Sequence, residues 1–537
     1  MSRQTWDVVV VGGGITGAGI ARDAAFRGLK VAVLEKNDWS SGTSSATSKL
    51  AHGGLRYLKT YEFSLVRESL RERRYLEIIA PHVVYPLPFI MPIYKQKFIL
   101  TAGMILYDLL SYDKNRLGDP SKKLPHFKLL SRKRTIALEP GIHSDGLKGG
   151  ALYYDCQNLY PDRVCLEFVR DAVHRGAMAA NYAKVTHFTS HAGNVTGVAV
   201  EDVLNPAQSY TISGKLVINA TGPWADLMFQ NSPAKLPKSV RRSKGIHLVT
   251  RPLTNGHALV LETKTGRVFF VLPWRGYSIV GTTDVDYKGN PDDVHVTEKD
   301  RDDLIRELNE VYPSARLTAD EVLYSYVGIR PLVEEVGKDT TEVSRKHELY
   351  DHEQWDRVKG LITVMGGKWT TTRELAEEVT DLAIKKLGRE PVACTTRTPL
   401  DVGHIDNLQA YIDAQVEMWR GKADAALVRS LIEIYGTRYR EVYERYVLDG
   451  APLDQDVFAV GHDEYAMGQI RDAIDNEMTV RLDDLLCRRT GMGTLGLLSH
   501  ERVVAICRYM ATCYGWDEGR VADEIDRYYR SFAIVKD

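Results

Sequence analysis

The sequence predicts a mixed α/β protein in three parts: a Rossmann-like dinucleotide-binding domain, a β-rich second domain and an all-helical C-terminal domain. Three observations support this prediction. A strand–turn–helix–strand pattern occupies residues 7–35, aromatic and β-branched runs separated by turns fill residues 243–344, and apolar residues recur at helical spacing beyond residue 391. The 537 residues suffice for about three to four domain-sized units.

Residues 7–35 read DVVVVGGGITGAGIARDAAFRGLKVAVLE, which is the pattern of a βαβ unit. An apolar strand is followed by Gly12, Gly14 and Gly17 in G-x-G-x-x-G spacing, and a small-residue helix leads to a second strand. Gly12 permits the tight turn, Gly14 lets the backbone approach a pyrophosphate, and Gly17 lets the helix pack close to the strand.

Further contacts are expected from the ends of this unit. The N–H groups at the start of the helix, at Ile15 and Thr16, are positioned to hold the anion. Glu35 ends the second strand and is followed by Lys36; its carboxylate would accept hydrogen bonds from a ribose 2′-OH, and its charge disfavours a 2′-phosphate, so NADP is not expected. The unit by itself fits NAD and FAD equally.

A hydroxyl-rich loop follows the second strand. It lies beyond the carboxyl end of that strand, where ligands bind in open α/β sheets, so we interpret it as part of the site rather than as a flexible linker. Its hydroxyls can bond phosphates and the polar edge of a flavin, and the paired glycines after it allow close approach to a planar ring. The cofactor-binding residues predicted here are Ser45, Thr47, Ser48, His52, Gly53 and Gly54, and Arg56 is a candidate anion clamp.

Two later strand–turn–helix patterns extend the site. The first has Thr221 and Gly222 after an apolar strand, and it supports a large dinucleotide. The second has Gly366, Gly367 and Lys368 between an apolar strand and a helix, where they would form a positive pole. Such a pole would stabilise the negative charge of a reduced flavin ring. Together the two patterns favour FAD.

Composition and short motifs exclude several classes of function. A net charge of −1 and a pI near 7.0 give no reason to expect a nucleic-acid partner. The six cysteines form no CxxC pair and no HExxH motif occurs, so neither a disulfide framework nor a metal site is expected. The chain enters its first strand without room for a signal peptide, and we expect a cytoplasmic protein.

Residues 97–110 (KFILTAGMILYDLL) are expected to form an apolar helix with basic residues on both sides. The apolar stretch is shorter than the ~18 residues that would argue for a membrane-spanning helix. The helix could lie in a membrane interface or be an ordinary buried helix, and the sequence alone favours the buried helix. The proline-rich residues 81–92 are expected to end the preceding helix, residues 61–80.

We set the domain boundaries where the character of the sequence changes. The FAD-binding domain is discontinuous, and the helical domain is expected to serve in support or oligomerisation, which allows for a homodimer. The boundaries are 1–60 with 150–242 and 345–390 for the FAD-binding domain, 61–149 with 243–344 for the β-rich substrate or cap domain, and 391–537 for the C-terminal helical domain.

Taken together, the motifs resemble a known family. The chain contains VVVVGGGITGAGIARDAAFRGLKVAVLEKND, SSATSKLAHGGLRYL, INATGPWAD, KGIHLV, VLPW with VGTTD, GIRPL and GGKWTTTRELAE. In this order they are similar to FAD-dependent sn-glycerol-3-phosphate dehydrogenases of the respiratory type, which belong to the D-amino-acid-oxidase-like flavoproteins. The resemblance spans residues 1–390, and HGGLRYL and GGKWTT are its most specific pieces.

The resemblance implies a reaction and its partners. A hydride would pass from C2 of glycerol 3-phosphate to N5 of FAD, giving dihydroxyacetone phosphate, and the electrons would go on to a membrane quinone. The protein would be bound peripherally to the inner, cytoplasmic face of the cell membrane. This shifts the expectation for residues 97–134, or for a nearby surface, toward membrane contact.

The resemblance also implies a substrate site. Its pocket would contain Arg56, Tyr57, Arg330, Arg345 and Lys368, with His247 nearby. We assign phosphate binding to the arginines, because guanidinium groups bind phosphate in bidentate fashion. Removal of the hydroxyl proton needs a base, for which the ordinary pKa of histidine suits His247, and an arginine–water arrangement stays open as the alternative. The predicted catalytic residues are His247, Arg330 and Lys368.

Three other functions were weighed against this one. A glycerol-3-phosphate oxidase that uses O2 usually carries an added segment that is not seen here. An amine or amino-acid oxidoreductase could use the same fold, but the arginine-rich pocket motif speaks against it. A flavin-binding regulatory or scaffold protein without turnover is disfavoured because the pocket residues are present.

Overall fold

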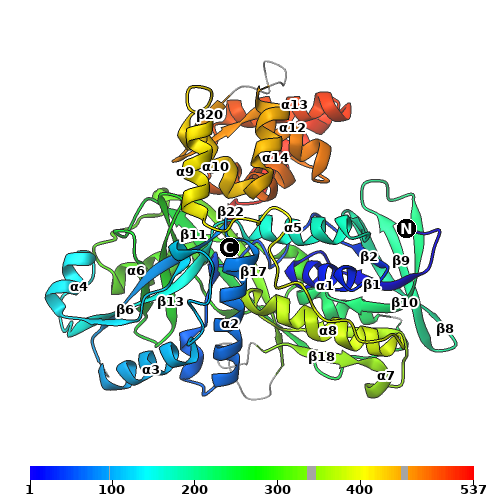
Figure 1. The fold of residues 1–537 in the computed structure, drawn as a ribbon, viewed down its shortest axis with the longest axis horizontal. Coiled ribbons are helices and arrows are strands. Elements are labelled where there is room, and N and C mark those ends of the chain that lie inside the picture. Colours follow the sequence, from blue (N-terminus) through cyan, green and yellow to red (C-terminus); the bar gives the residue numbers. More distant parts are fainter. Residues whose placement is uncertain (96, 231, 335–345, 449–456, 537) are drawn as a thin grey trace.

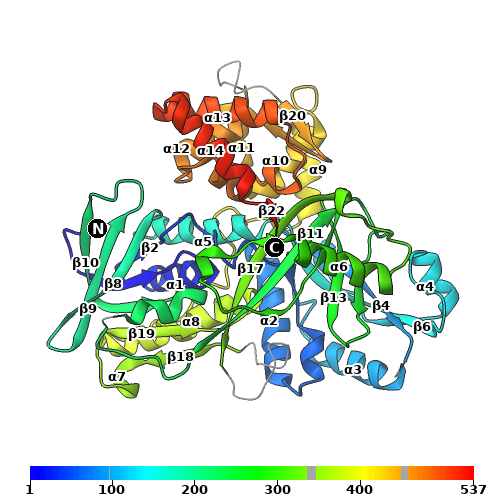
Figure 2. The same ribbon diagram turned by 180° about the vertical axis from the view of Figure 1, so that it is seen from behind.

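The computed structural model describes residues 1–95, 97–230, 232–334, 346–448 and 457–536. Figure 1 shows two large sheets side by side, with the C-terminal helices packed above the junction between them. The view from behind in Figure 2 shows that the N-terminus lies at the first sheet, whereas the C-terminus returns to the junction. The fold class predicted from the sequence is confirmed.

The first sheet is the core of the dinucleotide-binding fold. It consists of β1 (Trp6–Val11), β2 (Val31–Leu34), β7 (Met178–Ala180), β8 (Ala183–His191), β9 (Asn194–Asp202), β10 (Ser209–Asn219), β18 (Glu348–Asp351) and β19 (Leu361–Met365). The order is β18–β19–β10–β1–β2–β7, with β8 and β9 extending β10 as an antiparallel ribbon. From β19 to β7 the neighbours are parallel. Every residue of β1 and β2 is buried, which explains the unbroken apolar runs.

Three helices pack together beside this sheet. α1 (Ile15–Phe26) lies against α5 (Pro161–His174) and α8 (Thr372–Lys386), as Figure 1 shows. Because β1, β2, β10 and β19 are parallel, their carboxyl ends share one edge of the sheet. The glycine turn, the hydroxyl-rich loop and the two later turns each follow one of these ends, so the topology gathers them at that edge.

The second sheet is mostly antiparallel. Its strands are β3 (Leu50–Ala51), β4 (Val84–Ile93), β5 (Lys128–Leu130), β6 (Gly149–Asn158), β11 (Val240–Thr250), β12 (Ala258–Glu262), β13 (Val268–Trp274), β14 (Tyr277–Gly281), β15 (Val285–Asp286) and β17 (Val322–Val333). The order is β15–β11–β14–β13–β12–β4–β6–β3, with β17 on β11 and β5 on β6. The predicted hairpin is confirmed by the pairing of Trp274 with Tyr277.

Four helices accompany the second sheet: α2 (Phe63–Ile79), α3 (Lys97–Leu110), α4 (Arg132–Leu138) and α6 (Glu298–Val311). α6 interrupts a stretch that the sequence analysis treated as β-rich throughout. Strands β3 and β6 pair into this sheet, although their residues fall almost entirely within ranges assigned to the FAD-binding domain. The predicted domain limits themselves stay a prediction.

The proline-rich segment is more than the end of a helix, because it forms strand β4. Its ten residues pair with β6 without a break. Pro86, Pro88 and Pro92 all sit at even positions, so the N–H groups that they lack would all lie on one side of the strand. An antiparallel ladder uses N–H groups from alternate residues only, and the ladder with β6 is compatible with these prolines. Proline therefore hid a strand that the pattern alone did not reveal.

The exposure of α3 contradicts the expectation of an ordinary buried helix. Only Met104 and Tyr107 of this helix are buried. Phe98 is 91% exposed, Ile99 69% and Leu109 65%. The helix thus presents most of its apolar side chains outward. In the described part of the chain, no helix combines the length and apolarity needed to cross a bilayer.

The C-terminal domain is helical apart from a small hairpin. Its helices are α9 (Leu408–Met418), α10 (Ala425–Tyr435), α11 (Tyr439–Val442), α12 (Met467–Asn476), α13 (His500–Tyr514) and α14 (Glu518–Arg530), and the hairpin is β20 (Val457–Val460) with β21 (Asp463–Ala466). The tail strand β22 (Ile534–Val535) pairs with β16 (Val296–Thr297), next to α6. The short helix α7 (His352–Trp355) precedes β19. The six cysteines, all in the described part of the chain, form no disulfide.

Buried ion pairs fasten the helical domain to the first sheet's helices. Both carboxylate oxygens of Glu477 accept hydrogen bonds of 2.6 Å from Arg163 on α5, and Arg438 donates to the same carboxylate. Burial would raise the pKa of Glu477, but Arg163 and Arg438 outweigh burial and lower it. The helical domain is therefore held in one position against α5 by paired charges out of contact with water.

Candidate functional site

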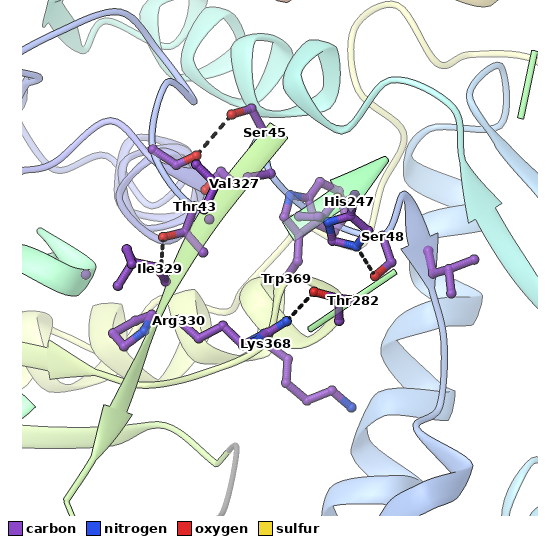
Figure 3. A pocket seen from close by; sticks show the side chains of 18 of the residues that line it. Thr43, Ser45, Ser48, His247, Thr282, Val327, Ile329, Arg330, Lys368 and Trp369 are labelled. Atoms are coloured by element: carbon purple, nitrogen blue, oxygen red, sulfur yellow. Dashed lines mark hydrogen bonds between the residues drawn. The ribbon is translucent and has the colours of Figure 1, made fainter. Parts of the chain in front are cut away.

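One continuous cavity of about 1470 Å³ lies where the carboxyl edge of the first sheet meets the second sheet. Every predicted site residue of the described chain lines it, except Gly17 and Gly53, which lie behind its wall. Arg345 falls outside the described residues. Figure 3 shows the part of the cavity around His247 and Arg330. Residues far apart in the sequence are thus gathered around a single space.

The glycine turn closes one end of the cavity. A Cβ atom at Gly17 would lie 1.8 Å from the carbonyl oxygen of Gly12, so only glycine lets α1 approach the end of β1 this closely. Gly14 is the N-cap of α1 and has no side chain to cap it, and the N–H of Ile15 donates to Oγ of Ser44 at 2.9 Å. Thr16 lines the cavity beside them. The start of α1 can therefore hold an anion, with Ser44 as a neighbour.

Glu35 lies beside this turn. Its Oε2 accepts a hydrogen bond of 2.6 Å from the N–H of Gly13, and its Oε1 accepts one of 2.8 Å from the N–H of Asn37. Burial raises the pKa of Glu35, and the two N–H groups oppose the rise. Each oxygen keeps a lone pair that a ribose hydroxyl could use. Lys36 is paired with Asp292 at the cavity wall.

The hydroxyl-rich loop lines the cavity, but its hydroxyl groups have different hydrogen-bond partners. The hydroxyl of Ser45 donates to the carbonyl of Gly42 at 3.0 Å, and Oγ1 of Thr47 accepts from the N–H of Lys49 at 3.1 Å. Ser48 instead lies 2.8 Å from a ring nitrogen of His247, a contact drawn in Figure 3. Two of the three predicted hydroxyls therefore shape their own loop as well as line the cavity.

His247 on β11 is held tightly. It is 2% exposed, and its ring stacks on that of Tyr326 with 4.8 Å between centroids. Its Nε2 faces the hydroxyl of Ser48, while Nδ1 has no partner among the described residues. Burial lowers the pKa of His247 well below its usual value, and the charges of Arg330 and Lys49 lower it further. The ring is therefore neutral near pH 7 and can accept a proton.

Two cations meet at the ring of Tyr57. Nζ of Lys368 lies 4.8 Å from the ring centroid and Cζ of Arg56 lies 4.9 Å from it. Arg56 also donates to the Tyr57 hydroxyl at 3.1 Å, and Lys368 donates to Oγ of Ser69 at 2.6 Å. Burial lowers the pKa of Lys368, and nearby Arg56 adds to this. This wall of the cavity attracts anions.

Arg330 reaches the cavity from β17 of the second sheet. One guanidinium nitrogen donates to Oγ of Ser243 at 3.1 Å, and the other donates to Oγ1 of Thr282 at 2.7 Å and to the carbonyl of Thr283 at 3.1 Å. The carboxylate of Asp284 is 3.9 Å away. These contacts fix the plane of the guanidinium group, as Figure 3 shows for its place beside Thr282.

The two later turns lie at the same edge of the cavity, with one difference from the prediction. Thr221 and Gly222 follow β10, and Gly366 and Gly367 follow β19. The helix does not start at the glycine pair: Lys368 is extended, a single 3-10 turn follows it, and α8 starts only at Thr372. The expected positive pole is therefore reduced to the N–H groups of a short turn and the charge of Lys368 itself.

Asp38 is a site residue that the sequence analysis missed. It follows Glu35 closely and is fully buried, and its carboxylate accepts two hydrogen bonds of 2.7 Å from Arg489 and one of 2.6 Å from Arg488. Burial would raise its pKa, but the two arginines outweigh burial and lower it to about 2. Arg488 also lines the cavity. The arginines come 450 residues later in the chain, so no local signal could have revealed the contact.

A dinucleotide-binding fold with a cavity lined by cations and a neutral histidine is typical of oxidoreductases that use a nucleotide cofactor. Residues 7–382 match the family model described as FAD dependent oxidoreductase, and residues 363–521 match the C-terminal domain of alpha-glycerophosphate oxidase. The chain belongs to the family of FAD-dependent oxidoreductases, and FAD is its cofactor.

Relatives and solved structures extend this result over the whole chain. A glycerol-3-phosphate dehydrogenase of Synechocystis sp. is 35% identical, covering 98% of this chain and 96% of its own length. An aerobic glycerol-3-phosphate dehydrogenase of Bacillus subtilis is 35% identical, covering 96% and 93%. The structure of the glycerol-3-phosphate dehydrogenase from Bacillus halodurans complexed with FAD is 30% identical, with a TM-score of 0.78 over 99% of this chain and 95% of that one.

The residues present fit FAD. The cavity is lined by Glu35, by the start of α1 and by Lys368, and its volume of about 1470 Å³ leaves room for a dinucleotide. A Cβ atom at Gly12 would lie 2.5 Å from the carbonyl oxygen of Ala220, so the wall that would face the pyrophosphate is backbone. The carboxylate of Glu35 suits a ribose, and Lys368 suits the electron-rich edge of a reduced ring.

From the contacts of Asp38 with Arg488 and Arg489 we predict that the C-terminal domain helps to hold FAD. Asp38→Asn would remove the negative charge from the buried Arg489 and the partly buried Arg488, and a broken buried pair costs about 3–5 kcal/mol. We expect the loop after Glu35 to loosen and the dissociation constant of FAD to rise at least ~10-fold, measured by the recovery of FAD fluorescence on dilution. Asp286→Asn, which affects a half-exposed pair with Arg241, is the matched control. Equal FAD retention in both variants would contradict the role.

Proposed function

We propose that the protein oxidises sn-glycerol 3-phosphate to dihydroxyacetone phosphate and passes the electrons to a membrane quinone. The observation that carries the proposal is the convergence of Arg56, Lys368 and Arg330 on one cavity with a neutral histidine. The names of the relatives, glycerol-3-phosphate dehydrogenase and its aerobic form, support the same substrate. We infer the substrate from the two together.

The cations suit a phosphate dianion on a small polyol. Arg330 presents a guanidinium whose orientation is fixed by Ser243 and Thr282, and such planar groups bind phosphate in bidentate fashion. Arg56 and Lys368 add two charges at the wall formed by Tyr57. We propose that these residues bind the phosphate and orient C2 of the substrate. Arg345 is proposed for the same pocket on the strength of the resemblance alone.

Bound FAD supplies the acceptor for the hydride that leaves C2 of the substrate. The C2 hydroxyl proton needs a base within reach. We propose His247, with the hydroxyl of Ser48 as the link to the cavity: Ser48 takes the substrate proton as it gives its own to Nε2 of His247. The nearby charge of Arg330 disfavours a positively charged His247, which favours onward loss of the proton. The stacked Tyr326 ring fixes the orientation of the imidazole.

We propose that the quinone, as the electron acceptor, reaches the protein beside α3. The cavity extends to Ile99, Leu100 and Gly103 of this helix, so its mouth opens beside the exposed apolar side chains. Lys95 and Lys97 are exposed at the start of the helix and would meet anionic headgroups. An apolar quinone dissolved in the bilayer could enter at this mouth. We propose that the protein attaches peripherally to the inner face of the cell membrane through the same surface.

Two alternatives differ in chemistry. A glycerol-3-phosphate oxidase would pass its electrons to O2, and peroxide formed in proportion to substrate would indicate it. An amino-acid oxidoreductase would need a partner for one carboxylate, an amine oxidoreductase would need no anion partner, and neither would bind a phosphate dianion. Because cations from both sheets surround the cavity, the phosphate substrate is favoured.

Arg330→Leu tests the substrate assignment. Loss of two charge-assisted contacts to phosphate costs about 1.5–3 kcal/mol each, so we expect the dissociation constant of glycerol 3-phosphate to rise at least ~30-fold. The measurement is anaerobic bleaching of the flavin absorbance against substrate concentration. Arg306→Leu, at an exposed arginine of α6, is the control and should bind as the parent does. No bleaching of the parent by glycerol 3-phosphate would overturn the proposed function.

The pH dependence of flavin reduction tests His247. Its pKa in the folded protein lies well below the usual value, so the neutral base is present above that pKa and is lost only as the pH falls through it. We therefore expect the limiting rate at saturating substrate to be flat from about pH 6 to 8, where an ordinary histidine titrates. His247→Gln should lower this rate by about 10²-fold or more. An inflection near pH 6.5 in the parent, or a fully active variant, would count against His247.

Replacing Phe98 and Leu109 by Glu tests the membrane surface. Burying each side chain in a bilayer is worth about 1.5–3 kcal/mol, so we expect the double variant to bind anionic phospholipid vesicles at least ~100-fold more weakly than the parent. Flotation with vesicles measures the bound fraction. Trp355→Glu, at a 61% exposed aromatic residue of α7, is the control. Equal flotation of the double variant and the parent would reject α3 as the contact.

A further inference from the structure

The turn formed by His52, Gly53 and Gly54 comes directly before two residues of the proposed substrate pocket. Arg56 and Tyr57 follow it directly in a short 3-10 helix, and Gly54 adopts a left-handed conformation with φ of 75°. The position of this turn therefore decides where the Arg56 guanidinium and the Tyr57 ring stand in the cavity. The turn has no side chain of its own at its two glycines, so its position must be set by groups behind it.

Asp155 on β6 provides such a group. Its Oδ1 accepts a hydrogen bond of 3.3 Å from the N–H of Gly53 and another from Nη1 of Arg73 on α2. Its Oδ2 accepts one of 2.7 Å from the hydroxyl of Tyr107 on α3. All three side chains are at most 3% exposed. One carboxylate thus joins the turn to a strand and to two helices.

The packing at Gly53 seats the turn directly against α2 and α3, and the hydrogen bond to Asp155 holds it there. A Cβ atom at this position would lie 2.4 Å from the Tyr107 hydroxyl and 2.4 Å from Cδ2 of Leu70. The backbone of the turn is therefore in direct contact with α2 and α3. Burial raises the pKa of Tyr107 well above its usual value, so its hydroxyl stays protonated and remains a donor to Asp155.

Neither Asp155 nor Tyr107 lines the cavity, in contrast to His52, Gly54 and Arg56. Their polar groups make hydrogen bonds to the turn, to Arg73 and to each other. We propose that Tyr107 and Asp155 are positioning residues for substrate oxidation: they hold the His52–Gly54 turn so that the groups after it meet the substrate in productive geometry. The inference rests on the proposed function, since it concerns the same pocket.

This arrangement gives α3 a role on its inner side. Met104 and Tyr107 are its two buried residues. The Tyr107 hydroxyl donates to the carboxylate of Asp155, which holds the His52–Gly54 turn. A displaced turn would carry Arg56 with it, and a misplacement of about 1 Å in a reacting complex can cost about 10²-fold in rate. The single hydroxyl of Tyr107 is therefore expected to matter for the reaction although it lies behind the cavity wall.

Tyr107→Phe is the sharpest test, because it removes one hydroxyl and keeps the ring. We expect the limiting rate of anaerobic flavin reduction by glycerol 3-phosphate to fall about 10-fold in the holoenzyme. FAD content should stay as in the parent, and the thermal midpoint should fall by a few degrees because Asp155 loses one buried donor. Reduction of the same flavin by dithionite, which needs no substrate turn, should keep its rate. Tyr210→Phe removes an exposed hydroxyl that donates to Gln208 on the first sheet's ribbon; it is the matched control and should react as the parent does.

Asp155→Asn provides a second variant with a larger expected loss, because it also leaves Arg73 without its carboxylate. Rates of substrate-driven reduction within twofold of the parent in Tyr107→Phe would overturn the proposal, and so would equal losses with substrate and with dithionite. Failure of glycerol 3-phosphate to reduce the parent would instead reject the proposed function, so the two failures can be told apart.

Discussion

The close approach of α1 to the end of β1 is the constraint on which the site depends. At Gly17 there is no room for a side chain, since a Cβ atom would lie 1.8 Å from the carbonyl of Gly12. The contact fixes the start of α1 against the carboxyl edge of the sheet. Because β2, β10 and β19 run parallel to β1, their own ends arrive at the same edge. The position of the cofactor follows from this one contact and from the direction of the strands.

Buried ion pairs between the C-terminal domain and the dinucleotide-binding fold fix how these two parts sit against each other. Asp38 meets Arg488 and Arg489, and Glu477 meets Arg163, in each case with one partner in the C-terminal domain. Such pairs contribute little net stability, because removing ions from water offsets much of their attraction. They fix the geometry because breaking one of them costs several kcal/mol of folding free energy. The helical domain cannot shift without leaving a buried charge unpaired, so the loop after β2 keeps its shape against the cofactor.

The two faces of α3 show how one helix can serve two purposes. Its outer face carries Phe98 and Leu109, which are 91% and 65% exposed. Its inner face carries Tyr107, which reaches Asp155 behind the substrate turn. The apolar run of the sequence identifies the helix but not which side faces the protein, because a largely apolar helix has no continuous polar face to point outward.

Local sequence alone determined the first sheet and the nature of its ligand. The run from Asp7 to Glu35 contains its own strand, turn, helix and acid, all within reach of one another, so its glycine spacing could be interpreted without the remaining chain. The turn at Gly222 could be interpreted in the same way, whereas at Gly367 the helix starts later than the local pattern predicts. Only the tertiary structure decided the rest: the strand hidden by prolines in β4, the outward face of α3, and the contacts of Asp38 and Asp155. The reason is physical. These features depend on partners brought together by folding from distant positions, and no periodicity or motif records a neighbour that lies hundreds of residues away.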